Sequence, residues 1–357
     1  MLASAASPPT AQPTPDPVLV GVCDFPGAYP FPPIGYGGIE RWLWAVAIGA
    51  RKAGAEVHLL GPQWRAELAA DWTIRPTRLE DLTPGKRQAR ELRAAGYDLL
   101  AVGHEYPSLP AWRTMWETLG TEVAAFQHWP YFQHCPDAFD GQRSRLYCYS
   151  EEMCGRYAVH RPIPELALHL GLGENELPAT EGTDLLWIGR IDAQKAPHLA
   201  IRAAQVLRRR LTIAGPVFDP SYVAEHRELF QSEYVTLAGE VAGKAKMHFL
   251  ADANVVAYTC ARGYIEAGAA TFGEALRAGS PVAALAWRHG TCAQAALCAN
   301  TGSIALVNPE APDGAAAKAL ANSIEQATLL PARHVQEIGL ARFDPVRHFR
   351  ALSGNSC

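Results

Sequence analysis

The sequence predicts an α/β protein made of two doubly wound halves, each a parallel sheet covered by helices, that face a central cleft. Short apolar, β-rich segments alternate with helical segments along the chain, a pattern that favours parallel sheets. The alternation stops at residues 171–182, where Gly, Pro and Glu gather in GLGENELPATEG, and then begins again. A chain of 357 residues is long enough for two domains, each with its own core.

The elements follow in the same order in both halves. Strands are expected at residues 18–23, 56–60, 99–103, 122–126 and 146–149 of the first half, and at 185–189, 211–214 and 303–307 of the second. Helices are expected at 39–53, 197–208 and 315–328, and FDPVRHFRAL at 343–352 predicts a short amphipathic helix. We therefore divide the chain into a disordered tail (1–16), an N-terminal domain (17–170), a hinge (171–182), a C-terminal domain (183–336) and a C-terminal segment (337–357) that packs back on the N-terminal domain.

Composition excludes several classes of protein. With 48% hydrophobic and 19% charged residues the chain is globular, and a net charge of -4 gives no reason to expect a nucleic-acid partner. The longest apolar stretches, such as 42–50, are too short to span a bilayer, and the N-terminus lacks the features of a signal peptide. The eight cysteines form no CxxC pair. We therefore expect reduced, mostly buried thiols in a cytoplasmic protein, with no metal site.

The strongest motif is IEAGAATFGEALRAGSPVAAL at residues 265–285. Glu266 and Glu274 are eight positions apart, about two helical turns, and would lie near one face if the stretch were helical. A Gly-rich helix start exposes unpaired N–H groups that suit a diphosphate, and nearby carboxylates can accept hydrogen bonds from sugar hydroxyls. Spacing alone favours the plainer alternative, in which Glu274 complements a helix N-terminus and Glu266 is solvated.

Each half carries one further motif after its first strand. In GRIDAQKAP, Arg190 and Lys195 lie in a loop at the carboxyl end of a strand, where they could neutralise a leaving diphosphate. The alternative is a pair of solvated surface cations. In IGYGGIER, Gly37 and Gly38 would let a phosphate or sugar approach the backbone closely, although the loop is not a GxGxxG fingerprint. The alternative there is a flexible turn.

The order and spacing of these three motifs resemble the retaining glycosyltransferases of the GT-B fold, specifically glycosyltransferase family four, the group related to bacterial glycogen and sucrose synthases. The resemblance covers residues 18–352, and LVNPE after Thr301-Gly302 fits the same pattern. It implies two Rossmann-like domains, of which the N-terminal one holds the acceptor and the C-terminal one the nucleotide-sugar donor.

The resemblance also implies roles for single residues. Gly37 and Gly38 match the loop that faces the donor phosphate and acceptor, and Arg190 and Lys195 match the pair that stabilises the departing nucleoside diphosphate. Glu266 matches the carboxylate that contacts the transferred sugar, and Glu274 the one that binds the donor ribose.

Two departures from the family pattern fall in these motifs. The family Phe-Gly is displaced here, so Thr271, Phe272 and Gly273 are assigned to the donor. The Gly that usually follows the lysine is replaced by Ala196-Pro197.

Strand-end residues of the first half complete the predicted site. His128 in VAAFQHWP resembles the family histidine near the sugar and acceptor, so the predicted catalytic set is Arg190, Lys195, Glu266 and His128. His104 in LLAVGHEYP occupies a comparable place and is assigned, with Trp129, to the acceptor. The alternatives are hydrogen-bonded structural histidines and a tryptophan that only packs.

The predicted function is transfer of a sugar, with retention of configuration, from a UDP-, GDP- or dTDP-sugar to a hydroxyl of a small-molecule or glycoside acceptor. No cofactor and no metal are expected, because fixed cations would stabilise the leaving group. The Ala-, Arg- and Pro-rich composition points to a high-GC bacterium and to secondary-metabolite, or antibiotic, biosynthesis.

Two other functions stay open. A nucleotide-sugar epimerase or hydrolase of the same fold is disfavoured by GGIER and by the two spaced glutamates. A non-catalytic sugar-binding protein would be expected to carry an export signal and would not need the Arg–Lys pair.

Overall fold

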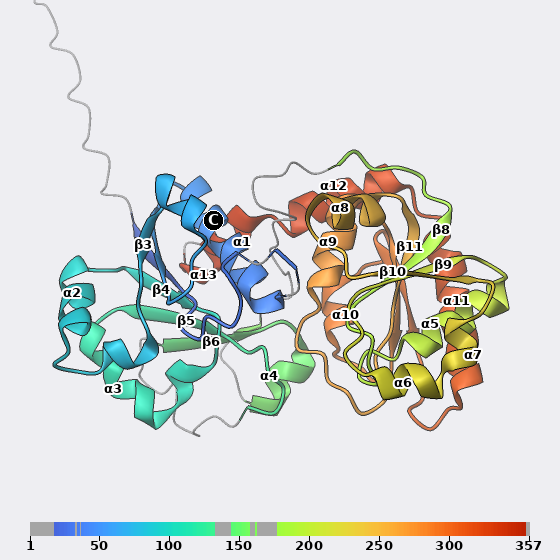
Figure 1. Ribbon diagram of the computed structural model, residues 1–357, viewed down its shortest axis with the longest axis horizontal. Helices are drawn as coiled ribbons and strands as arrows, with labels where there is room; N and C mark the ends of the chain where they lie inside the picture. The colour runs from blue at the N-terminus through green and yellow to red at the C-terminus, as the bar shows by residue number, and fades with distance from the viewer. Residues whose placement is uncertain are drawn as a thin grey trace, which may run out of the picture.

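The computed structural model describes residues 18–32, 34–35, 37–132, 144–157, 161–162 and 177–354. Two lobes lie side by side, each built around one sheet with helices packed on it (Figure 1). This arrangement confirms the predicted pair of doubly wound α/β domains. The predicted tail (1–16) and the first half of the predicted hinge (171–176) lie outside the described residues.

The N-terminal sheet is parallel throughout and has the order β3-β2-β1-β4-β5-β6-β7. Its strands are β1 (Leu19–Cys23), β2 (Glu56–Leu60), β3 (Thr73–Arg75), β4 (Leu99–Val102), β5 (Glu122–Phe126), β6 (Ser144–Cys148) and β7 (Arg161–Pro162). The central strands are apolar on both faces because helices cover both sides, as is usual for parallel sheets. Its long helices are α1 (Gly38–Lys52), α2 (Arg87–Ala95), α3 (Pro110–Leu119) and α4 (Glu151–Tyr157).

The C-terminal sheet repeats this topology with the order β10-β9-β8-β11-β12-β13, again all parallel. Its strands are β8 (Asp184–Ile188), β9 (Leu211–Ala214), β10 (Val235–Gly239), β11 (Ala253–Tyr258), β12 (Val282–Ala286) and β13 (Gly302–Leu306). The helices are α5 (Pro197–Leu207), α6 (Pro220–Glu225), α7 (Arg227–Phe230), α8 (Gly243–Ala251), α9 (Ala270–Ala278), α10 (Cys292–Ala296), α11 (Asp313–Thr328), α12 (Ala332–Arg342) and α13 (Pro345–Leu352).

Strand order in both sheets creates the place where a ligand can bind. The chain moves outward in one direction from β1 to β3 and then crosses back to β4, and the second sheet does the same from β8 to β10 and then to β11. Loops that leave neighbouring strands in opposite directions open a crevice at the carboxyl edge of the sheet. The loops after β1, β4, β8 and β11 carry the GGIER motif, His104, the Arg–Lys motif and Glu266, respectively.

The last helix belongs structurally to the other lobe. After α12 the chain crosses over, and α13 lies against α1 of the N-terminal domain (Figure 1). Gly49 of α1 permits this close approach, because a Cβ there would lie 2.0 Å from the carbonyl oxygen of Pro345. The indole N–H of Trp42 donates to His348 Nε2 at 2.9 Å, so a buried hydrogen bond fixes the register of the two helices.

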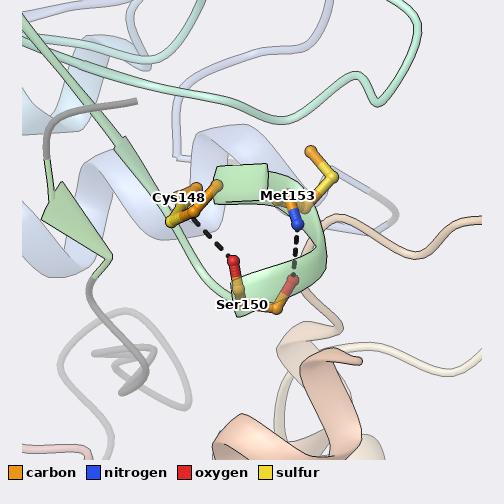
Figure 2. The surroundings of a disulfide bond; sticks show 4 residues. Cys148, Ser150 and Met153 are labelled. Carbon is orange, nitrogen blue, oxygen red and sulfur yellow. Dashed lines mark hydrogen bonds between the residues drawn. A yellow bond between two sulfur atoms is a disulfide. The ribbon is translucent and has the colours of Figure 1, made fainter. Parts of the chain in front are cut away.

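One expectation about the cysteines is wrong. Cys148, the last residue of β6, and Cys154 in α4 form a disulfide, and their Cα atoms lie 6.1 Å apart (Figure 2). The tight strand-to-helix turn at Ser150, whose hydroxyl accepts from the Met153 N–H at 3.3 Å, brings the two residues together. Cys23, Cys260 and Cys292 are buried free thiols and Cys298 is exposed, whereas Cys135 and Cys357 lie outside the described residues.

None of the helices in the described part of the chain combines the length and the apolar character needed to cross a lipid bilayer.

Candidate functional site

Two connected cavities lie where the lobes meet. The central cavity, of about 420 Å³, is lined by residues of the loops after β1, β4, β5, β8 and β11. A smaller cavity, of about 110 Å³, adjoins it and contains Arg41, Lys246 and Glu274; it is called here the donor cavity, after the role that the sequence predicts for Glu274. Both cavities are lined by Gly37, Gly38, Gly189, Ala270 and Thr271. The three sequence motifs therefore converge on one site.

The start of α1 and the start of α9 both line this shared region. Gly37 caps α1 with φ of 148°, a conformation that favours glycine, and a Cβ on Gly38 would meet no atom within 4 Å. Ala270 and Thr271 open α9, which has no side-chain cap, so its first N–H groups are available to a ligand. In Figure 1, α1 and α9 stand on facing sides of the two lobes. An anion placed between them meets a helix N-terminus from each domain.

Lys195 and Glu266 form an ion pair through Nζ and Oε2 in the central cavity. The ammonium group of Lys195 also lies 5.1 Å from the centre of the Tyr264 ring, and the Tyr258 hydroxyl donates to the same Glu266 oxygen at 3.3 Å. Both charged side chains are mostly buried, at 17% and 13% exposure. The pair therefore presents a fixed cation and a fixed carboxylate side by side to a ligand.

Backbone bonds hold the loop that carries Lys195. Its N–H donates to Asp192 Oδ1 at 2.9 Å, and its carbonyl accepts from the Thr259 hydroxyl at 2.7 Å. Ala196, in the position where the family has Gly, adopts φ of 46°, a left-handed conformation that costs a residue with a Cβ about 1–2 kcal/mol. The replacement thus keeps the backbone turn that glycine would provide.

Arg190 lines the same cavity from the opposite end of this loop. Its Nε lies 3.3 Å from Asp192 Oδ2, and its Nη2 donates to Gln194 at 3.1 Å. The guanidinium packs over the ring of Phe218 at 5.2 Å. These contacts orient the guanidinium, and the two predicted cations lie in one cavity.

Glu274 lies in the donor cavity and not beside Glu266. Glu266 lies in the loop before α9, which begins at Ala270, so the stretch is not helical throughout and the two glutamates do not share a helical face. Glu274 is 2% exposed and pairs with Lys246 of α8, with Nζ 2.5 Å from Oε2. Burial works against its ionisation, but Lys246 and Arg41 outweigh that effect and lower the pKa of Glu274. The residue is an ionised, nearly fully buried carboxylate in the wall of the donor cavity.

The three residues assigned to the donor at the start of α9 differ in their surroundings. Thr271 lines both cavities. Phe272 is 1% exposed and packs against the Tyr258 ring at 4.6 Å, and Gly273 is buried within the helix. Thr271 therefore faces the cavities, whereas the Phe272 side chain belongs to the core behind them.

On the N-terminal side, His104 and His128 both line the central cavity. Burial lowers the pKa of His104 to about 4, and burial together with His104 lowers the pKa of His128 to about 3. The N–H groups of His128 and Trp129 both donate to one oxygen of Glu105, at 2.7 and 2.8 Å. Glu105 thus fixes the loop after β5, and both imidazoles are neutral at pH 7.

Trp129 does not line either cavity and is 57% exposed. Its ring meets Phe132 edge-on at 6.3 Å. An exposed indole beside the loop of His128 is free to stack on a bulky ligand, so its assignment to the acceptor remains a prediction.

Two buried carboxyl groups lie on the same side of the site. Asp24 follows β1 and is 1% exposed, and among the described residues neither of its oxygens has a hydrogen-bond partner at close range. Burial and the neighbouring Glu40 raise the pKa of Asp24 to about 7, which the nearby Gly27 N–H offsets only in part. Glu40 itself lines the central cavity, and burial raises its pKa also.

Sequence reasoning missed several residues of the site. Lys246 lies in GKAKM, which carries no recognisable signal, and it meets Glu274 only because α8 packs beside α9. Tyr258 and Tyr264 lie on either side of the Lys195–Glu266 pair, and only their closeness to Glu266 in the sequence could have indicated this. Glu105, next to His104, could not be connected with His128 before β4 and β5 were known to be neighbours.

Within the residues that the structure describes, no cluster of His, Cys, Asp and Glu side chains is arranged to hold a metal ion.

One family of known proteins matches part of the sequence. The family of glycosyl transferases group 1 matches residues 174–332, which contain Arg190, Lys195, Glu266 and Glu274. No protein with a curated description matches the sequence closely enough to extend this comparison.

Several solved glycosyltransferases share the fold along nearly their whole length. AviGT4, a glycosyltransferase involved in avilamycin A biosynthesis, is 21% identical with a TM-score of 0.68, covering 95% of this chain and 99% of its own. WaaG, a glycosyltransferase involved in lipopolysaccharide biosynthesis, is 14% identical with a TM-score of 0.61, and the match covers 94% of this chain and 100% of WaaG. Sucrose-phosphate synthase from Thermosynechococcus elongatus is 18% identical with a TM-score of 0.56, and the match covers 94% of this chain and 96% of the synthase.

These likenesses show that the two domains have the GT-B arrangement, and the family match covers most of the C-terminal domain. Residues 174–332 of the chain match the glycosyl transferases group 1, and the whole chain shares the two-domain fold of these solved glycosyltransferases.

Proposed function

We propose that the protein transfers a sugar from a nucleoside-diphosphate sugar to a hydroxyl group of a small-molecule or glycoside acceptor. The observation that carries this proposal is the convergence of Arg190, Lys195 and Glu266 on a cavity that the Gly37-Gly38 loop closes from the other domain. The nucleoside diphosphate lies in the donor cavity, and the sugar extends from it into the central cavity.

The roles of the residues follow from their charges. Arg190 and Lys195, with the free N–H groups of α1 and α9, stabilise the negative charge that grows on the diphosphate as the glycosidic bond breaks. Glu274, an ionised carboxylate in the donor cavity, accepts hydrogen bonds from the ribose hydroxyls. Glu266 accepts from a hydroxyl of the transferred sugar, and its bond to Lys195 fixes both groups.

Retention of configuration requires the acceptor to attack from the face that the diphosphate leaves. The neutral imidazoles of His104 and His128 line the acceptor side of the central cavity and can orient hydroxyl groups without adding charge. The acceptor proton passes to the departing phosphate oxygen, which the fixed cations hold in place. This chemistry is positioning and electrostatics, and it needs no covalent intermediate.

The acceptor belongs, in this proposal, to bacterial secondary metabolism. Its support is the composition of the chain together with the fold likeness to a glycosyltransferase of avilamycin A biosynthesis. Trp129, exposed beside the His128 loop, offers a surface on which a bulky acceptor can stack.

The test is a two-stage assay. Thermal shifts with UDP-, GDP- and dTDP-sugars identify the donor, and mass spectrometry then follows product formation with a panel of glycoside and polyketide acceptors. NMR of the product gives the anomeric configuration. A glycoside with the donor configuration supports the proposal, whereas release or isomerisation of the sugar with every acceptor would support an epimerase or hydrolase instead.

A further inference from the structure

One contact between the domains lies close to the donor sugar site and has no part in the roles given above. Glu152, in the first turn of α4, accepts from Nε of Arg288, which follows β12 in the other domain. The backbone N–H of Glu152 also donates to the carbonyl of Gly290 at 2.9 Å. The two domains are therefore joined here by a charged pair and a backbone bond.

Arg288 has further partners on its own side. Its Nη1 donates to the carbonyl of Arg262 at 3.0 Å, and its Nη2 donates to the carbonyl of Tyr264 at 2.8 Å. Both carbonyls belong to the loop of residues 259–269, called here the sugar loop, which links β11 to α9. One guanidinium thus holds a carboxylate of the N-terminal domain and two carbonyls of the sugar loop at once.

The sugar loop carries the groups that surround Lys195. Tyr264, whose carbonyl Arg288 holds, places its ring 5.1 Å from the Lys195 ammonium, and Glu266 pairs with that ammonium directly. A displacement of the loop backbone at residue 264 moves both groups. Small misplacements of such groups reduce catalysis strongly because reactive geometry tolerates little error.

The N-terminal domain touches the sugar loop at a second point. Tyr149, at the same strand-to-helix turn as Glu152, packs on Gly268, where a Cβ would lie 2.4 Å from the Tyr149 ring. The disulfide between Cys148 and Cys154 braces this turn, because it joins the end of β6 to α4 on either side of Tyr149 and Glu152 (Figure 2). The turn is therefore a rigid part of the N-terminal domain.

We propose that Glu152 and Arg288 act as positioning residues through which contact between the domains sets the sugar loop, and with it Tyr264 and Glu266, in the geometry that binds the donor sugar. In the proposed function the nucleoside part of the donor binds in the other cavity, against Glu274 and Lys246, which neither Glu152 nor Arg288 lines. The inference rests on the proposed function for the identity of the ligand, but the contact itself can be tested without any ligand.

The guanidinium geometry explains why Arg is needed at residue 288. Its planar fork donates in three directions at fixed angles, whereas a lysine ammonium at the same place is a single point charge. Glutamine at residue 152 keeps the shape of Glu152 and removes the charge. Glu151, the exposed neighbour in the same turn, has no ion pair in the part of the chain that the structure describes, so Glu151→Gln is the matched control.

Hydrogen exchange of the ligand-free protein tests the contact. Loss of a charge-assisted hydrogen bond should speed exchange of the amides of residues 259–269 by about tenfold in Glu152→Gln and Arg288→Lys. The control Glu151→Gln should match the wild type. Unchanged exchange of the sugar loop in both variants, or equally faster exchange throughout the C-terminal domain, overturns the proposal.

Calorimetry separates positioning from plain stability. The ligands are the UDP-, GDP- or dTDP-sugar that shifts the melting temperature most and the corresponding nucleoside diphosphate. Glu152→Gln should weaken binding of the sugar nucleotide about tenfold and leave the affinity for the nucleoside diphosphate unchanged. Equal weakening of both, or of neither, overturns the positioning role. If none of these nucleotides binds the wild type, the proposed function fails, while the exchange experiment still decides whether Glu152 controls the sugar loop.

Discussion

Replacement of Glu274 separates its proposed role in binding from its role in the fold. The carboxylate is 2% exposed and pairs with Lys246, whose side chain is 15% exposed, at 2.5 Å. Glu274→Ala leaves the Lys246 ammonium buried without its partner, and such a change costs about 3–5 kcal/mol of stability when the pair is fully buried. Because the donor cavity leaves Lys246 partly accessible to water, the loss of stability should be smaller, and we expect about 2–4 kcal/mol for Glu274→Ala.

The same substitution removes the acceptor of the ribose hydrogen bonds. Bonds from a ribose to a charged carboxylate contribute about 1.5–3 kcal/mol, which corresponds to a loss of about tenfold to a hundredfold in affinity for a nucleoside diphosphate. Because the single variant changes both stability and affinity, it cannot assign either effect. The double variant Glu274→Met with Lys246→Met removes both charges and fills the space with apolar groups, which restores most of the stability.

Denaturant unfolding and calorimetry with UDP, GDP and dTDP then compare the wild type with Glu274→Ala, Lys246→Met and the double variant. The expected result is a double variant that is folded and nearly as stable as the wild type, but whose nucleotide affinity is as low as that of Glu274→Ala. A double variant that regains wild-type affinity would refute the ribose role, since binding would then follow the integrity of the fold alone. Lys246→Met alone should lower stability and leave the carboxylate available.

Three further predictions concern other parts of the site. Arg190→Ala and Lys195→Ala should each lower kcat ~10²–10³-fold, because in the proposed mechanism both cations stabilise charge in the transition state. Melting temperatures are the control for folding, and turnover near that of the wild type in both variants would refute the leaving-group role. Asp24 has a folded pKa of about 7 against an ordinary value of 3.8, so ionisation of Asp24 destabilises the folded protein increasingly as the pH rises from about 4 to about 7. Asp24→Asn should therefore be more stable than the wild type at pH 8, by about 4 kcal/mol, and should lose this advantage at pH 4 in denaturant unfolding. Trp129→Ala should raise the KM of the acceptor and leave nucleotide affinity and stability unchanged, because the side chain is 57% exposed; an unchanged acceptor KM would assign the residue to packing.

The strands and helices of the sheets were predictable because their local signals agree with the fold. Residues 56–60, 122–126 and 211–214 are strands as predicted, and the helix after Lys195 begins at Pro197 because proline favours the first helical position. Glu266 and Glu274 show where spacing fails. A spacing of eight is compatible with a helix, but Gly268 and the turn before Ala270 keep Glu266 in a loop, so the two carboxylates enter different cavities.

Partners that come from distant parts of the chain could not be predicted. Lys246 meets Glu274, and Glu152 meets Arg288, only because helices or domains pack together, and no local pattern in the sequence encodes such contacts. The disulfide between Cys148 and Cys154 was missed for a related reason. A separation of six residues joins two cysteines only if the chain turns sharply between them, and Ser150 makes that turn.

Charge is distributed unequally across the central cavity, and this distribution follows from the topology. The loops after β8 and β11 bring Arg190 and Lys195 to the C-terminal side, where a diphosphate would meet fixed cations. On the N-terminal side the described lining offers Glu40 and two imidazoles whose lowered pKa values keep them neutral at pH 7. A diphosphate between the domains would therefore meet the side-chain cations Arg190 and Lys195 on the C-terminal side and the start of α1 on the N-terminal side. In the proposed transfer these cations hold the leaving phosphate on the face where the acceptor hydroxyl attacks, so that a phosphate oxygen can accept the acceptor's proton, as front-face transfer with retention requires.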